Sequence, residues 1–421
     1  MAIESRTGQF MTGTGAVAST IEINFSSAMA AAPTFVLVYF SGRTEDGTDG
    51  VGRLSHKRGI GFVVSASDRR QISTFSLDAS ASADTGARVT AADCIAIMSA
   101  AGTVDGAFDL TSMDSDGFTL DVTNQFGASY AVSYWAITGT TAVEGGAITA
   151  PLAIGNVDYT LTGAFQGDVV MLLAVNSTAA LPATAIDSTI MFGAASGASN
   201  QFVIVGGSND AATTTDSNSA GLFGDVIAIP ASNVATIVAR AKLVQFNTNG
   251  FRLEWIEVSG NAHNIFYVVI KGGSWSVNES LTQTDTTTDI VISGLAFTPV
   301  GGIVAGVCAA EDATDTLHAH DQWSFGAWSS TTERNVHAIL DEDNAADSET
   351  SAAAEYDAVY ANISTSSAIQ GLMDLKSIDA GAGATFIMDD ADPSQSWFGS
   401  IMVGNVAAAA TVKHLAILGV G

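Results

Sequence analysis

Apolar and polar residues alternate with a period of two along much of this chain. Every second residue of 118–122 and of 251–255 is a large apolar one. This alternation is typical of β-strands with one buried face. Short runs rich in Val, Ile, Phe and Tyr are separated by turn sequences such as Asp116-Gly117 and Asn249-Gly250. No amphipathic helix of three turns is visible, so the pattern predicts an all-β fold.

Three landmarks recur with a period of about 133 residues, which predicts tandem homologous units. They are an apolar opening strand (33–40, 167–175, 299–307), an Asp before an apolar run (93–97, 225–229, 357–361), and a Leu before a turn and strand (110–120, 243–253, 375–386). About eight short strands in each unit are typical of an antiparallel sandwich. We therefore expect three tandem antiparallel β-sandwich domains of jelly-roll-like character, over 1–145, 146–278 and 279–421.

The third copy offers two candidates for its closing strand, 397–404 and 411–419. The first copy closes on 130–137 and the second on 265–272. The segment 412–417 is more similar to the closing strand of the first copy. We therefore expect the third copy to close on 411–419, with 391–405 as an insertion.

The order of these motifs resembles a known class of modules. The opening strand Pro33–Val38, the segment Asp116–Leu120 and the closing strand Ser133–Gly139 resemble the compact β-sandwich modules of phage and prophage virion proteins. More distantly they resemble the H-type lectin module, which ends on a similar Gly-Phe and Trp-x-Ala-x-Gly pattern. The resemblance covers most of the first two copies and the skeleton of the third. It implies a non-enzymatic particle component, an adhesin, or both, and no sugar-contacting residue of the lectins maps onto this chain.

Charge and composition limit the classes of partner that the chain could bind. The chain carries 43 acidic and 15 basic residues, a formal net charge of −28, which disfavours nucleic acid and anionic lipid as partners. The longest apolar runs are strand-sized, and the first ten residues lack the apolar core of a signal peptide. Two cysteines do not make a disulfide framework. We expect assembly in a host cytoplasm and no membrane insertion.

The charges are unevenly distributed. The third domain has 20 acidic and 3 basic residues, whereas the first domain contains a basic zone within 53–70, formed by Arg53, His56, Lys57, Arg58, Arg69 and Arg70. This asymmetry indicates either docking through a basic patch or ordinary surface charge.

Few residues suggest a ligand site. His318 and His320 would share one strand face and could bind a metal ion with His337 or Glu333. The acidic loops 45–50 and 341–344 carry oxygen ligands suited to a divalent cation such as calcium, and no other cofactor is expected. Trp323, Trp328 and Trp397 lie near predicted strand ends, where their rings could stack on a sugar. The alternative for the tryptophans is burial in a core or interface. The alternative for the histidines and the acidic loops is a solvated surface.

No motif of a known hydrolase or nucleotide-binding enzyme stands in its required context. We therefore expect a non-enzymatic structural component of a phage virion on the particle exterior, as a capsid decoration, a spike or a fibre- or tail-associated protein. Its expected partners are other virion proteins and further copies of itself. The alternative is a carbohydrate-binding adhesin or receptor-binding protein that binds a host surface glycan. A third hypothesis is a secreted β-sandwich hydrolase, or its accessory module, that is exported by a signal-independent route.

Overall fold

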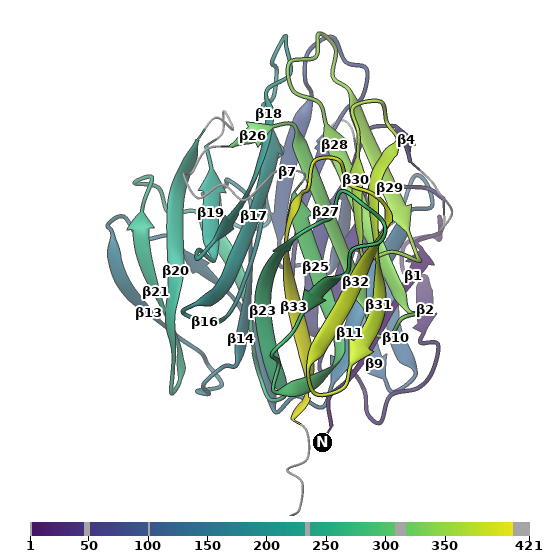
Figure 1. Ribbon diagram of the computed structural model, residues 1–421. Coiled ribbons are helices and arrows are strands. Elements are labelled where there is room, and N and C mark those ends of the chain that lie inside the picture. The colour runs from purple at the N-terminus through teal and green to yellow at the C-terminus, as the bar shows by residue number, and fades with distance from the viewer. Residues whose placement is uncertain (1, 46–50, 100–101, 232–235, 308–316, 407–421) are drawn as a thin grey trace, which may run out of the picture.

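The computed structural model describes residues 2–45, 51–99, 102–231, 236–307 and 317–406, which form strands and loops without a helix (Figure 1). No helix that could span a membrane therefore occurs in these ranges. The all-β prediction is confirmed. Thirty-three strands fall into three sets of eleven, one set in each copy of the sequence repeat, which we call repeats 1, 2 and 3.

Repeat 1 contains β1 (Glu4–Met11), β2 (Thr20–Asn24), β3 (Phe35–Phe40), β4 (Gly52–Arg53), β5 (Gly59–Ser65), β6 (Asp68–Ser76), β7 (Thr85–Thr90), β8 (Ile95–Met98), β9 (Val104–Asp114), β10 (Gly117–Asn124) and β11 (Ala131–Thr138). Repeat 2 contains β12 (Ala142–Thr149), β13 (Gly155–Thr160), β14 (Val169–Ala174), β15 (Ala183–Ala185), β16 (Ile190–Gly197), β17 (Asn200–Ser208), β18 (Ser217–Phe223), β19 (Ile227–Pro230), β20 (Ile237–Asn247), β21 (Gly250–Glu257) and β22 (Asn264–Lys271). Repeat 3 contains β23 (Ser274–Leu281), β24 (Ile290–Ile292), β25 (Phe297–Val307), β26 (His318–Ala319), β27 (Asp321–Trp328), β28 (Arg334–Asp341), β29 (Thr350–Glu355), β30 (Tyr360–Ile363), β31 (Ile369–Asp379), β32 (Gly383–Asp390) and β33 (Trp397–Val406).

Each repeat forms one four-stranded antiparallel sheet and supplies six strands of a seven-stranded one. The seven-stranded sheets have the orders β1-β11-β3-β5-β6-β7-β15, β12-β22-β14-β16-β17-β18-β26 and β23-β33-β25-β27-β28-β29-β4. The four-stranded sheets are β2-β10-β9-β8, β13-β21-β20-β19 and β24-β32-β31-β30. The three sets thus have the same topology.

The last strand of every seven-stranded sheet comes from another repeat. β15 of repeat 2 pairs with β7 of repeat 1, β26 of repeat 3 pairs with β18 of repeat 2, and β4 of repeat 1 pairs with β29 of repeat 3. The exchange runs in a cycle that closes on itself. No repeat therefore completes its larger sheet with its own strands alone.

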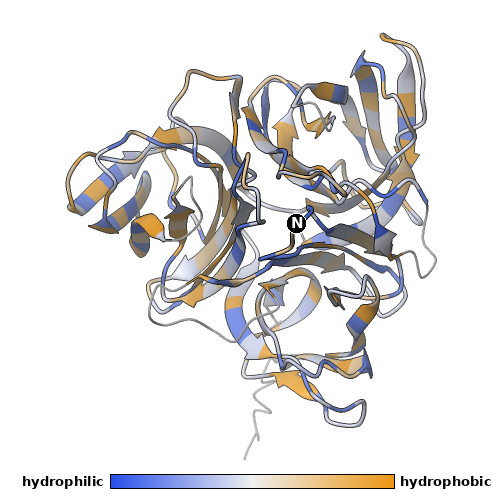
Figure 2. Cartoon of the chain, turned by 90° about the horizontal axis from the view of Figure 1, so that it is seen from above, coloured by the Kyte–Doolittle hydropathy of each residue, from blue (hydrophilic) through white to orange (hydrophobic). Residues whose placement is uncertain are grey.

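The three repeats surround a common axis, and Figure 2 shows them as three lobes about the centre. The seven-stranded sheets bring their inner faces together in one hydrophobic core, in which Ile60, Phe192 and Phe325 hold equivalent positions. Their outer faces pack against the four-stranded sheets in further cores. Strands such as β3 and β14 are therefore buried along their whole length, because both faces of the sheet are covered.

One glycine in each repeat permits the close approach of the two sheets. A Cβ atom at Gly61, Gly193 or Gly326 would lie 2.2, 1.9 or 2.1 Å from a backbone carbonyl oxygen just before the edge strand of the four-stranded sheet. Contacts this short are sterically forbidden for any side chain. Glycine at these three equivalent positions thus sets the spacing between the sheets.

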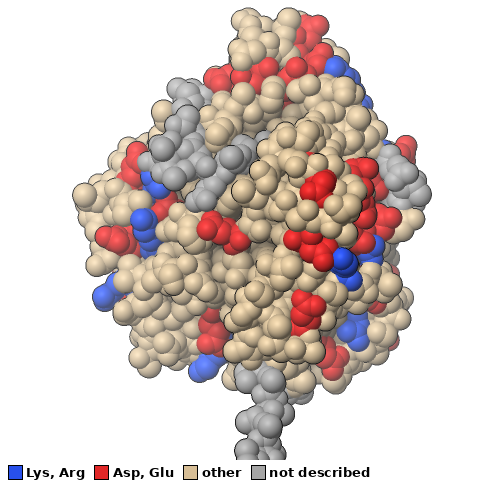
Figure 3. Space-filling view, viewed as in Figure 1, with Lys and Arg blue, Asp and Glu red and all other residues tan. Residues whose placement is uncertain are grey.

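The hairpin tips that join β6–β7, β17–β18 and β28–β29 meet at the top of the axis. One residue in each tip has a left-handed backbone and donates its N–H to the next tip: Ala79 to Ser348 (2.7 Å), Ala211 to Ala83 (2.7 Å) and Asn344 to Thr215 (2.9 Å). An aspartate in each tip accepts a backbone N–H from a neighbouring repeat: Asp78 from Thr350, Asp210 from Thr85 and Asp343 from Ser217. Acidic side chains gather at this end of the molecule (Figure 3).

Two details differ from the sequence-based expectations. β33 pairs with β23 and β25 as β11 pairs with β1 and β3. Residues 397–406 are therefore the closing strand and not part of an insertion, and the favoured alternative over 411–419 lies outside the described residues. The expected boundaries after residues 145 and 278 fall inside β12 and β23. β12 pairs along its length with β22, the closing strand of repeat 2, and β23 pairs with β33, the closing strand of repeat 3.

Candidate functional site

The tryptophans proposed as sugar platforms are core residues. Trp323, Trp328 and Trp397 are 2%, 0% and 1% exposed. Trp323 stacks on Phe325 in the central core, and Trp397 contacts Phe202 of repeat 2 edge-on. No ring face is open to a pyranose, so this prediction is wrong. The polar neighbours Ser324 and Ser396 did not mark exposed strand ends, because they are themselves buried, at 1% and 0% exposure.

The proposed metal ligands do not come together. His337 is fully buried, and its two ring nitrogens lie 2.9 and 3.0 Å from the hydroxyls of Ser41 and Ser133 of repeat 1. Burial lowers the pKa of His337 to about 3, so the ring is neutral. His320 Nδ1 accepts the backbone N–H of Asp343. Within the described ranges, no three His, Cys, Asp or Glu side chains are grouped as metal ligands.

The candidate calcium loops have other partners. In the loop 341–344, Asp341 is buried beside His56 and Asp343 accepts a backbone N–H of repeat 2. Of the loop 45–50, residues 46–50 lie outside the described residues, and Glu45 is paired with Arg43 at 2.7 Å.

The basic zone of 53–70 carries little free positive charge. Its arginines and lysine are paired with acidic residues: Arg53 with Glu349, Lys57 with Asp105, Arg58 with Asp321, Arg69 with Asp109 and Arg70 with Asp68. These ion pairs neutralise most of the positive charge of the zone, and docking through it stays a prediction.

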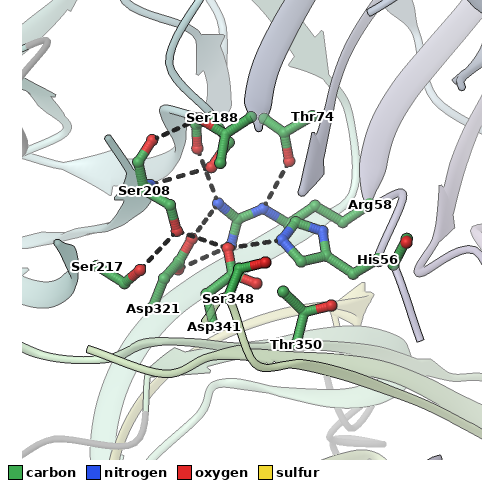
Figure 4. Close-up of polar contacts among 12 residues, drawn as sticks. His56, Arg58, Thr74, Ser188, Ser208, Ser217, Asp321, Asp341, Ser348 and Thr350 are labelled. Atoms are coloured by element: carbon green, nitrogen blue, oxygen red, sulfur yellow. Dashed lines mark hydrogen bonds and ion pairs between the residues drawn. The ribbon is translucent and has the colours of Figure 1, made fainter. Parts of the chain in front are cut away.

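A buried polar junction joins the three repeats below the hairpin tips (Figure 4). At its centre the Arg58 guanidinium forms two hydrogen bonds with the carboxylate of Asp321, at 2.8 and 2.5 Å. It also donates to Thr74 Oγ1 at 3.0 Å and to the Ser188 carbonyl of repeat 2 at 3.2 Å. Both charged side chains are 0% exposed. The arginine of repeat 1 thus binds an aspartate of repeat 3 and the backbone of repeat 2.

A second pair adjoins the first. His56 Nε2 lies 2.9 Å from Asp341 Oδ2, and this oxygen also accepts the hydroxyl of Ser208 at 2.5 Å. Ser208 in turn contacts Ser217 at 2.9 Å. The pKa of Asp341 lies below its usual value because His56, Ser208 and Arg58 outweigh the effect of burial, which raises it. The Asp341 carboxylate therefore stays ionised.

The junction uses equivalent positions of the repeats. The strand registers place His56, Ser188 and Asp321 at one position, and they place Ser76, Ser208 and Asp341 at another. Sequence reasoning missed the junction because it took His56 and Arg58 for surface charges. Alignment of the three copies would have shown unlike polar residues recurring at two positions. The junction is closed to solvent and joins the repeats, so we assign it a structural role.

A groove in repeat 2, with a volume of about 1260 Å³, hollows the surface of the described structure. Its walls come from the arm 176–187 that leads to β15, the hairpin tip around Asp210, the start of β20 and the segment 257–263 that follows β21. His263 is 3% exposed, and its Nε2 contacts Ser259 at 2.7 Å while its Nδ1 has no hydrogen-bond partner. Asp187 is 5% exposed, and burial raises its pKa although its carboxylate accepts the backbone N–H of Asp210. Sequence reasoning gave no sign of this groove.

No protein-family profile matches the chain, and no curated protein is significantly similar to it. Among solved structures, the chain shows a very weak similarity to the fructofuranosidase of Schwanniomyces occidentalis. A variant of that enzyme complexed with fructosylnystose has a TM-score of 0.14 and 7% identity over 91% of this chain and 97% of the other. The complex with fructose has a TM-score of 0.13 and 6% identity over the same shares.

Proposed function

We propose that this protein is a non-enzymatic structural component of a phage virion, exposed on the particle exterior as a capsid decoration, spike or fibre- or tail-associated protein. In this proposal each repeat is a jelly-roll-like β-sandwich module, and other virion proteins are the partners. The proposal begins with the similarity of the strand and turn motifs to modules of virion proteins.

The cyclic exchange of strands among the repeats is the observation that favours this role most. Each repeat gives one strand to a neighbour and receives one, and the three larger sheets share a single core. The hairpin tips and the buried junction add hydrogen bonds and ion pairs between the repeats. Such a body resists local opening, because no repeat can separate without breaking two sheets. Rigidity of this kind suits a protein whose task is mechanical and architectural.

The experiment is electron microscopy of the purified protein and of particles isolated from lysates in which the chain is expressed during phage production. Density of a three-lobed body fixed to a capsid or tail, at the size of one chain or of a symmetric oligomer of chains, would support the proposal. A monomer that never associates with particles would refute it.

A carbohydrate-binding adhesin or receptor-binding protein is the second candidate, because the groove of repeat 2 offers polar side chains on a concave surface. It would also act at a surface, and the two roles are compatible in one particle protein.

A further inference from the structure

We propose that the groove of repeat 2 binds a neutral saccharide. The first argument is its form. Its volume of about 1260 Å³ exceeds the roughly 300–1,000 Å³ of most small-molecule pockets. The groove is also open to solvent and not enclosed. A chain of several sugar rings fits such a groove better than a compact ligand does.

The second argument is charge. The groove is lined by carboxylates of Asp187, Asp210 and Glu257, while no lysine or arginine is among its described lining residues. An anionic ligand would meet only like charge there and would be repelled. Burial already raises the pKa of Asp187. Phosphorylated, sialylated and uronate-containing ligands are therefore disfavoured.

The third argument is the mixture of donors and acceptors. Amides of Asn176, Asn209 and Asn261 line the groove beside the carboxylates, and each amide can donate and accept. A bare cation needs acceptors only, and the described residues hold no grouping of three metal ligands. Sugar hydroxyls need both kinds of partner at once. The lining therefore matches a polyhydroxylated ligand better than a metal ion.

The fourth argument is an unmet hydrogen bond. His263 is 97% buried in the groove wall, since only 3% of it is exposed, and its Nδ1 has no partner. Burial lowers the pKa of His263, so the neutral ring can use this nitrogen as an acceptor. A buried polar atom without a partner costs about 1–3 kcal/mol in folded proteins. A hydroxyl of the ligand that reaches this nitrogen would satisfy it.

This inference is independent of attachment to a particle, because it concerns the purified chain alone. Saturation-transfer NMR of the full chain, in the presence of EDTA, would be recorded with maltotriose, cellotriose and triacetylchitotriose. Sialyllactose and trigalacturonate serve as anionic probes, and spermidine serves as a cationic one. We expect transfer to at least one neutral saccharide and none to the anionic probes. Transfer to none of the neutral probes, or to spermidine alone, would overturn the proposal.

Two substitutions locate the site. Glu257→Ala and Asn176→Ala remove groove side chains that make no hydrogen bond to another described residue. Neither substitution should therefore disturb the fold. The matched control is Asp390→Ala, because Asp390 holds in β32 the position that Glu257 holds in β21. We expect each groove variant to bind roughly fivefold to tenfold more weakly, the loss of one hydrogen bond, and the control to bind like the parent. Equal affinity of all three variants and the parent would show that binding occurs elsewhere and would overturn the assignment.

Discussion

The buried pair of Arg58 and Asp321 permits a sharp test of how the repeats are joined. Arg58→Met replaces the guanidinium by an apolar side chain of similar length. Asp321→Ser introduces the residue type that repeat 2 has at the equivalent position, Ser188. The two single variants and the double variant form a thermodynamic cycle.

The structure sets the expected magnitudes. Arg58→Met leaves the Asp321 carboxylate buried without its two hydrogen bonds, and Asp321→Ser leaves a buried guanidinium that keeps only Thr74 and a carbonyl. Breaking a fully buried ion pair on one side costs about 3–5 kcal/mol of unfolding free energy. Removing both charges is expected to cost less than about 2 kcal/mol. The coupling energy would then be about 4 kcal/mol or more.

The assay is equilibrium unfolding in urea, followed by circular dichroism and by tryptophan fluorescence, whose transitions should coincide because the three repeats share one core. The destabilisation of the single variants should hardly change with salt, since ions do not screen a pair at 0% exposure. Single variants that lose less than about 1 kcal/mol, or a double variant whose loss equals the sum of the two, would refute the reasoning.

Three further outcomes follow from buried features. Burial lowers the pKa of His337 to about 3, so the unfolded chain binds more protons than the folded one between pH 3 and about 6.5. His337 should therefore reduce stability as the pH falls through that range, and His337→Ile, the residue type at the equivalent position 72, should flatten the pH dependence measured by urea titration. Gly193→Ala should destabilise by about 1–3 kcal/mol, because its Cβ would lie 1.9 Å from a carbonyl oxygen, whereas Gly197→Ala in the same strand meets no atom within 4 Å; equal melting temperatures of the two would contradict the sheet spacing. Acrylamide should quench the native tryptophan emission weakly, since five of the six tryptophans are fully buried, and strong quenching would reopen the case for exposed sugar platforms.

Much of the strand pattern could be predicted from the sequence because burial on one face produces alternation. The outer strands β10 and β21 alternate and belong to four-stranded sheets with one covered face. The opening strands β3 and β14 are continuous apolar runs, and this is the signature of a sheet covered on both faces. The sequence thus indicated that the sheets are layered, but it did not indicate that the three repeats surround a common axis.

The candidate sites were harder to predict because a polar residue can be buried against a neighbouring repeat. His337 lies within an apolar run, Val336 to Leu340, and this context favours burial over metal binding. Its partners Ser41 and Ser133 are 296 and 204 residues away. No pattern of spacing shows such pairs. The groove of repeat 2 likewise depends on the path of the arm 176–187, which carries no recognisable motif.

The joining of three repeats in one chain has a consequence for the buried junction. A trimer of identical subunits must place the same residue at all three equivalent positions around its axis. Three aspartates or three histidines there would repel one another when charged, and three serines would carry no charge to pair with Arg58. Covalent linkage removes this restriction, so one position holds His56, Ser188 and Asp321, and each could be selected separately. Linking the repeats in one chain thus allows an asymmetric contact in place of a symmetric one. Because that contact can form in one arrangement only, it fixes which repeat occupies which place around the axis.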